Sequence, residues 1–117
     1  MLIFLSKTDK IAEVISRETG KPTWEALTEA KALAGKIKIT IEHSIKLVSE
    51  ERIENALHDT DGVVRYKSRG VMAVVGPFNF PVHLPNGHII PALLTGNTVV
   101  FKPSDKTPAC GQIMAEM

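Results

Sequence analysis

The chain has 117 residues, which is one domain at most, and its 44% hydrophobic and 23% charged content is typical of a globular protein. The formal net charge of +1, with no run of five lysines or arginines, argues against a protein that binds nucleic acid or an anionic membrane through its charge. Residues 1–5 are shorter than the core of a signal peptide, and no apolar stretch approaches the ~20 residues of a membrane-spanning helix, so we expect a cytoplasmic protein.

Two helices are predicted in the first half of the chain. In residues 6–20 the apolar residues share one face, Ser6 and Asp9 fit a capping pattern, and Gly20 is a natural terminator. A second, longer helix is predicted in residues 22–50, where apolar residues recur every three or four positions. Its predicted apolar stripe consists of Leu27, Ala30, Ala34, Ile37, Ile41, Ile45 and Val48. The acidic segment that follows, up to residue 61, is interpreted as a surface crossing.

After residue 62 the pattern changes from helix to strand. Residues 64–68 alternate with charged side chains, which predicts an exposed or edge strand. Residues 71–75 and 98–101 are continuous apolar runs, typical of strands that are covered on both faces. The helical stretch between them predicts a βαβ unit with parallel strands and a right-handed crossover. Pro91 inside that stretch, together with an Asn-Gly pair, predicts a kink or a late start of the helix.

The predicted fold is α/β, with an N-terminal helical segment at residues 1–62 followed by a βαβ segment at residues 63–117. A last helix should begin near Thr107 and still be running at Met117. Two parallel strands form only part of a doubly wound, Rossmann-like sheet, whose edges need further partners. The sequence is therefore interpreted as an incomplete N-terminal fragment.

Two unusual loops follow the two buried strands, at the edge where parallel sheets bind ligands. The first, Gly-Pro-Phe-Asn-Phe-Pro, contains Asn79, whose amide can donate a hydrogen bond to an oxyanion. Pattern alone favours the alternative that Asn79 caps the next helix or completes the turn. The second loop begins with Lys102, and Ser104 and Asp105 follow it. These residues suit ribose hydroxyls or a phosphate, although a solvated lysine before a turn explains Lys102 equally well.

Other reactive residues carry weaker signals. Cys110 lies near a predicted helix N-terminus, where a thiol pKa can fall, but no histidine is close in sequence and its small neighbours favour a buried structural role. The single cysteine also excludes an internal disulfide. His83 and His88 are five residues apart and do not share a helix face, so no metal site is predicted. Neither common glycine-rich phosphate-loop motif is present.

The loop motifs carry a family resemblance. "GPFNFP", followed by "GNTVVFKPSDKTP", resembles the aldehyde dehydrogenase superfamily, NAD(P)-dependent enzymes that oxidise aldehydes through a cysteine thioester. The insert "HLPNGHI" is most similar to the succinylglutamate semialdehyde dehydrogenases of arginine catabolism within that superfamily. The resemblance covers nearly the whole chain from about Thr8. It implies NAD as cofactor, a small aldehyde substrate and a homo-oligomer, and it makes residues 63–117 part of an NAD-binding segment.

The resemblance also implies roles for single residues. Asn79 matches the asparagine whose amide holds the oxyanion of the thiohemiacetal, and Lys102 matches the lysine that binds the adenosine ribose. Asp105 falls where many members carry a glutamate that prefers the 2′-hydroxyl of NAD, so the shorter acid leaves the choice between NAD and NADP open. The residues implied to line the same cofactor cleft are Pro77, Phe78 and Ser104.

Several family features are not matched. The nucleophilic cysteine, the general-base glutamate and the glycine-rich helix over the pyrophosphate have no counterpart, and Cys110 stands in a different motif. The prediction is therefore a fragment of an NAD-dependent aldehyde dehydrogenase that is inactive alone. One alternative is a non-catalytic module that binds a nucleotide or self-associates through unpaired strands and the long apolar stripe. A short enzyme that uses Cys110 is the least favoured alternative.

Overall fold

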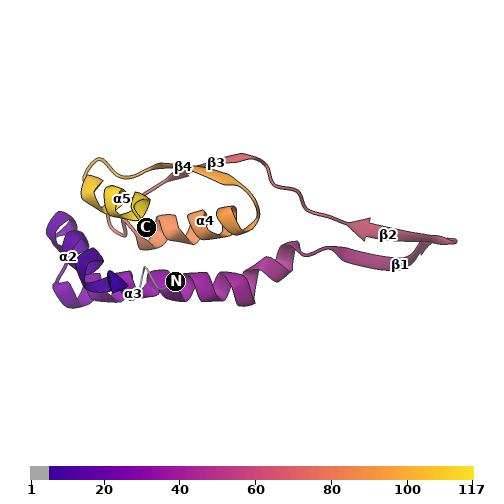
Figure 1. Cartoon of the computed structure of the whole chain (residues 1–117), viewed down its shortest axis with the longest axis horizontal. Helices are drawn as coiled ribbons and strands as arrows, with labels where there is room; N and C mark the ends of the chain where they lie inside the picture. Colours follow the sequence, from indigo (N-terminus) through magenta and orange to yellow (C-terminus); the bar gives the residue numbers. More distant parts are fainter. Residues whose placement is uncertain (1–5) are drawn as a thin grey trace.

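A computed structural model describes residues 6–117, so the apolar run at residues 1–5 lies outside the described residues. The molecule is elongated, with principal-axis extents of 63 × 24 × 20 Å (Figure 1). The first half consists of α2 (Thr8–Thr19), α3 (Thr23–Glu42), the 3-10 helix η1 (Ser44–Val48), β1 (Glu51–Leu57) and β2 (Thr60–Val64). The second half consists of β3 (Val71–Val75), α4 (His83–Leu94), β4 (Thr98–Lys102) and α5 (Pro108–Ala115).

Both N-terminal helices are confirmed, and Gly20 ends the first as predicted. Its φ of 75° is left-handed, and its N–H donates to the carbonyl of Ser16 at 2.9 Å. The predicted apolar stripe of α3 is only partly correct: Ala30 is in the core and Leu27 packs against it, but α2 and α4 otherwise select a neighbouring face of the helix. The buried residues of α3 are Ala26, Glu29, Ala30, Leu33 and Thr40. Ile41, a member of the predicted stripe, is exposed.

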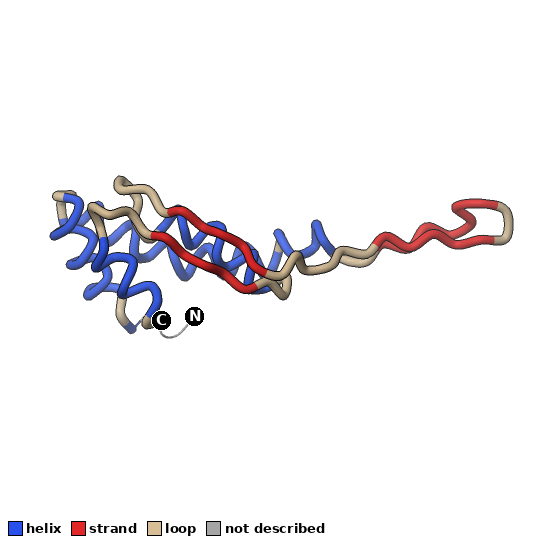
Figure 2. The backbone as a smooth tube through the Cα atoms, turned by 90° about the horizontal axis from the view of Figure 1, so that it is seen from above, coloured by secondary structure: helices blue, strands red, loops and turns tan. Residues whose placement is uncertain are grey.

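The helices end before residue 50, and an antiparallel hairpin of β1 and β2 replaces the predicted surface crossing. It projects far from the rest of the chain (Figure 2), and all but one of its strand residues are exposed. Residue pairing ends at Glu51↔Val64, so the edge strand predicted at 64–68 is wrong. Cross-strand charge pairs, such as Arg52 with Asp61 at 2.6 Å, stabilise this register.

The predicted βαβ unit is confirmed. Strands β3 and β4 are parallel, with Val71 opposite Thr98 and Val75 opposite Lys102, and α4 packs on the pair. The predicted late start of α4 is wrong, since the helix begins at His83 and includes the Asn-Gly pair and Pro91. Coverage on both faces is also not seen, because Val71 and Val75 are 68% and 71% exposed. One face of the described strand pair is therefore open.

The last helix begins at Pro108 as predicted, but it ends at Ala115 rather than running to Met117. The N–H of Met117 donates to the Met114 carbonyl, three residues back, which closes the last turn. Helix α5 packs on α2, and its Cys110 and Ile113 complete a core shared with α2 and α3. The other buried core residues are Ile11, Ala12, Val14, Ile15, Ala26, Ala30, Leu33 and Val82. The N-terminal helices therefore support the segments that follow both strands.

Candidate functional site

The two predicted loops meet at the carboxyl ends of β3 and β4. The N–H of Gly76 donates to the carbonyl of Lys102 at 2.9 Å, so the two loops leave the strands side by side. Further out, the ammonium of Lys106 lies 5.6 Å from the ring centroid of Phe78, within the range of a cation–π contact. An alanine Cβ at Gly76 would lie 3.0 Å from the Phe101 ring, so glycine permits this close approach.

Asn79 is exposed, and its side chain makes no hydrogen bond to any residue within the described part of the chain. The alternative that it caps the next helix is wrong here, because another residue does so. The N–H groups of Val82, the N-cap residue of α4, and of His83, its first residue, donate to Oε1 of Glu29 at 3.2 and 3.1 Å. The Asn79 amide is therefore available to another group.

Glu29 itself is buried, at 4% exposure, and is fully paired. Its Oε2 accepts from the ammonium of Lys21 at 2.8 Å. The same ammonium lies 3.6 Å from the ring centroid of Phe80, the residue that follows Asn79. Sequence analysis missed this pair. The available signal was an acidic residue three positions after Ala26, on the face of α3 that turns out to be buried.

A second carboxylate caps the helix that follows the second loop. The two oxygens of Glu18, in α2, accept from the N–H of Ala109 at 2.9 Å and the N–H of Cys110 at 2.8 Å. Both amides belong to the first turn of α5, where the helix dipole also stabilises a negative charge. Burial acts to raise the pKa of Glu18, but these hydrogen bonds outweigh it and hold the pKa below the usual glutamate value.

Acid is therefore expected to loosen α5. A carboxyl whose folded-state pKa is lowered stabilises the fold above its unfolded pKa, and this contribution is lost as the pH falls through the folded pKa. Between about pH 5 and pH 2, hydrogen exchange at the amides of Ala109 and Cys110, corrected for the intrinsic pH effect, should lose protection. In Glu18→Gln this pH dependence should vanish. Constant protection in the unmodified chain across that range would contradict the assignment.

Lys102, Ser104 and Asp105 form a polar rim on the second loop, in which Lys102 and Asp105 are exposed and Ser104 is half-buried. The ammonium of Lys102 donates to the carbonyl of Pro103 at 3.1 Å, which leaves two of its three protons for a ligand. Ser104 Oγ accepts from the N–H of Lys106 at 3.2 Å and orders the turn. The exposed carboxylate of Asp105 can accept from hydroxyl groups. This set of donors and acceptors fits the hydroxyls of a ribose.

Cys110 does not belong to this site. It has no exposed surface and lies in the core beside Ile113. Burial raises the pKa of its thiol, and the hydrogen bond and negative charge of Glu18 raise it further. A reactive cysteine needs the opposite, an accessible thiol with a lowered pKa. The interpretation of Cys110 as a buried structural residue is confirmed.

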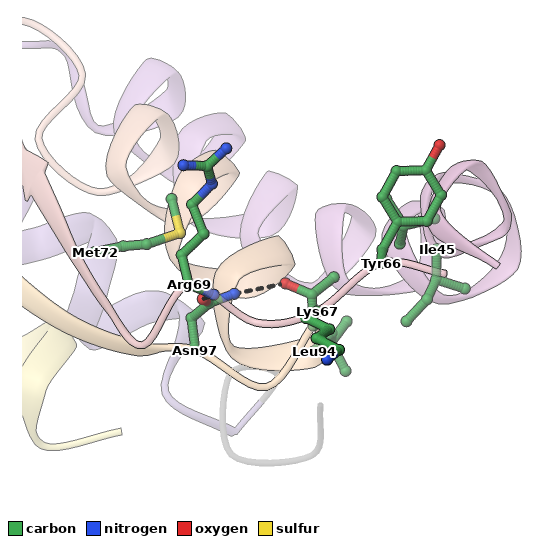
Figure 3. Close-up of a pocket in the computed structure, with 9 residues that line it drawn as sticks. Ile45, Tyr66, Lys67, Arg69, Met72, Leu94 and Asn97 are labelled. Carbon is green, nitrogen blue, oxygen red and sulfur yellow. Dashed lines mark hydrogen bonds between the residues drawn. The ribbon is translucent and has the colours of Figure 1, made fainter. Parts of the chain in front are cut away.

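A separate pocket of about 480 Å³ lies at the amino ends of the two strands (Figure 3). Asn97 on its wall is buried and fully bonded: Oδ1 accepts from the N–H of Arg69 at 2.7 Å, and Nδ2 donates to Thr95 at 2.9 Å. Its role there is to order the backbone. No predicted site residue lines this pocket.

Within residues 6–117, no three potential acidic, histidine or cysteine ligands lie close enough together to hold a metal ion. The same part of the chain contains no helix with the length and hydropathy needed to cross a membrane. The polar groups at the carboxyl edge of the strands are thus the candidate site.

A model of the aldehyde dehydrogenase family matches residues 2–117. N-succinylglutamate 5-semialdehyde dehydrogenase 1 of Caulobacter vibrioides is 53% identical over 112 residues, which are 96% of this chain and 23% of the relative. The N-succinylglutamate 5-semialdehyde dehydrogenase of Vibrio cholerae is 50% identical over 115 residues, again 96% of this chain and 23% of the relative. The chain thus spans about a quarter of the length of these curated relatives.

Solved structures show the same relationship. Lactaldehyde dehydrogenase from Escherichia coli matches with a TM-score of 0.86 and 30% identity, over 97% of this chain and 24% of that one. An NADP-dependent glyceraldehyde-3-phosphate dehydrogenase from Bacillus halodurans, complexed with NADP, matches with a TM-score of 0.86 and 31% identity. This match covers 97% of this chain and 25% of that one. The α/β, Rossmann-like fold class predicted from the sequence is confirmed. By its sequence and its fold, the chain belongs to the aldehyde dehydrogenase family.

Proposed function

We propose that this chain supplies the oxyanion-binding amide and the ribose-binding rim of a cytoplasmic, NAD-dependent dehydrogenase that oxidises N-succinylglutamate semialdehyde to N-succinylglutamate. The observation that carries the proposal is the exposed, unbonded Asn79 amide on the loop beside Lys102. The choice of aldehyde follows the names of relatives that are 50–53% identical to this chain.

In this proposal, Asn79 stabilises the oxygen on which negative charge develops when a thiolate attacks the aldehyde carbon. A preorganised amide donor of this kind contributes about 3 kcal/mol to the transition state. A free amide suits this task better than one that already bonds its own backbone, because no hydrogen bond has to break first. The dinucleotide accepts the hydride when it is bound, and Lys102 and Asp105 hold its ribose, with Pro77, Phe78 and Ser104 beside it.

We further propose that the chain does not complete this reaction by itself. Its only cysteine is buried, and the raised pKa of that thiol disfavours the thiolate that a thioester mechanism requires. The role of the chain is then to bind and orient, while an accessible thiol comes from outside these 117 residues. Production of NADH from aldehyde by the isolated chain, abolished in Cys110→Ser, would contradict this.

The Lys102→Ala variant tests the cofactor assignment. Titration of NAD into the labelled chain, followed by proton–nitrogen NMR, should move the signals of residues 76–81 and 102–107, and the variant should bind about tenfold more weakly. Loss of one charge-assisted hydrogen bond accounts for a change of this size. Lys38→Ala, an exposed lysine on α3, is the matched control and should bind like the unmodified chain. Equal affinity in all three proteins would overturn the assignment of Lys102.

The carboxylate of Asp105 is proposed to favour NAD over NADP. A carboxylate repels the 2′-phosphate of NADP, so NADP should bind more weakly than NAD in the same titration. Asp105→Asn should narrow that difference, because the charge is removed while an acceptor oxygen remains. Stronger binding of NADP than of NAD to the unmodified chain would contradict the proposed preference.

The hairpin favours a second property, self-association. Ile53, Val63 and Val64 are large apolar residues left exposed on two strands that, among the described elements, pack mainly on each other. An isolated hairpin is only marginally stable in water. We propose that β1 and β2 pair with a second copy in a homo-oligomer. A mass of one chain in sedimentation at high protein concentration would exclude this for the isolated chain.

A further inference from the structure

The carboxylate of Glu29 contacts the start of α4, just after the turn that carries Asn79. It lies in the middle of α3, its carboxylate is buried, and the backbone it bonds is 53 residues away in sequence. Burial of a carboxylate is costly unless donors surround it. Three donors do so here: the Lys21 ammonium on one oxygen, and the amides of Val82 and His83 on the other.

Helix α4 has no cap of its own. Its N-cap residue is Val82, which has no polar side chain, and Asn79 does not bond the first turn. The first amides of a helix lack internal partners and carry a partial positive charge. Without Glu29, the amides of Val82 and His83 would be left to water or to the nearest side-chain acceptor, and Asn79 is three residues upstream of Val82.

The partner of Glu29, Lys21, contacts the residue directly after Asn79. Lys21 forms the ion pair at 2.8 Å and also lies 3.6 Å from the Phe80 ring centroid. The pair thus contacts the backbone shortly after Asn79 through Glu29 and the adjacent side chain through Lys21. A single ion pair, between α3 and the connection that precedes it, thus holds the turn at two points.

We propose that the Lys21–Glu29 pair is a positioning device for Asn79: it supplies the cap of α4 in place of Asn79 and holds Phe80, so that the Asn79 amide stays free and fixed. The inference rests on the proposed function only for what the amide then binds. Glu18 is the corresponding positioning residue for the second loop, because it caps α5 through Ala109 and Cys110.

The test compares two double variants that differ only in the acceptor at position 29. Glu29→Gln alone would leave the ammonium of Lys21 with only the more distant carboxylate of Glu25, at 3.7 Å, so Lys21→Met is added to both. Lys21→Met/Glu29→Gln retains an oxygen that can accept from Val82 and His83, whereas Lys21→Met/Glu29→Leu has none. Hydrogen exchange at these two amides should be about tenfold faster in the leucine variant than in the glutamine variant.

The deciding readout is Asn79 itself, in the full chain without any ligand. In the leucine variant the side-chain amide signals of Asn79 should shift and its backbone order parameter should fall, toward 0.6 or below, whereas the glutamine variant should stay near ~0.85. Glu18→Leu is the matched control and should move Ala109 and Cys110 but not Asn79. A folded leucine variant whose Asn79 signals equal those of the glutamine variant would overturn the proposal.

The single variant Lys21→Met keeps the test decisive if the leucine variant does not fold. It leaves Glu29 with its two backbone donors and removes both the ion pair with Glu29 and the contact with Phe80. The ring signals of Phe80 and the amide signals of Asn79 should both shift, and unchanged Asn79 signals would overturn the proposal. The NAD titration reports separately on the proposed function, so a chain with a well-positioned Asn79 that binds no NAD would contradict only that function.

Discussion

The Asn97→Ala variant is expected to lose about 2–3 kcal/mol of unfolding free energy, whereas Asn79→Ala is expected to lose almost none. The Asn97 amide accepts from the N–H of Arg69 and of Gly70 and donates to the Ala92 carbonyl and to Thr95. Alanine would leave the N–H groups of Arg69 and Gly70 without their acceptor, whereas the Ala92 carbonyl would keep its bond from the backbone N–H of residue 97. The Asn79 amide bonds nothing in the described chain, so its removal should leave the fold intact.

Asn79→Ala, the variant with the smaller expected loss of stability, should have the larger loss of activity. In an intact enzyme of the proposed function, Asn79→Ala should lower kcat by roughly 10²–10³-fold, the usual effect of removing one oxyanion donor. Urea unfolding of both variants and steady-state kinetics of the enzyme provide the two measurements. A large loss of stability in Asn79→Ala would show that this amide supports the turn and would contradict its assignment as a free donor.

Replacing Gly111 with alanine is expected to destabilise the chain by about 2 kcal/mol. The new Cβ would lie 2.4 Å from Cγ and 2.5 Å from Cβ of Pro103, far inside van der Waals contact. The ring of Pro103 is tied to its own backbone, so the loop that follows Lys102 must move. Overpacking of this kind costs about 3 kcal/mol at its upper range, and the better helix propensity of alanine offsets about 1 kcal/mol.

Gly35→Ala is the matched control, because Gly35 is also helical but its Cβ would meet nothing within 4 Å. It should raise the free energy of unfolding by about 0.5–1 kcal/mol. The two variants thus differ in sign, and urea unfolding distinguishes them. In the NAD titration, Gly111→Ala should also bind more weakly, since Pro103 adjoins Lys102. If Gly111→Ala proves as stable as the unmodified chain, the close packing of α5 on this loop is wrong.

The βαβ unit was predictable because its signals are local. Residues 71–75 and 98–101 are uninterrupted apolar runs, and Gly20 marks a helix end by its own backbone preference. The hairpin was not predictable in the same way. Its strands bury no face, and Asn55 and Asp59 adopt positive φ. The ion pairs that join its two sides, Arg52 with Asp61 and Arg65 with Glu50, link residues that no pattern within one strand contains.

The amino-acid sequence by itself determined the α/β class, the parallel strand pair, the two loops at its carboxyl edge and the family to which the chain belongs. Only the tertiary structure decided which face of α3 is buried and that Asn79 is free, because Glu29 caps α4 from 53 residues away and Glu18 caps α5 from 91 residues away. Periodicity reports the preference of a segment for helix or strand. A buried carboxylate becomes a cap only when folding brings distant amides to it, so its role depends on long-range contacts.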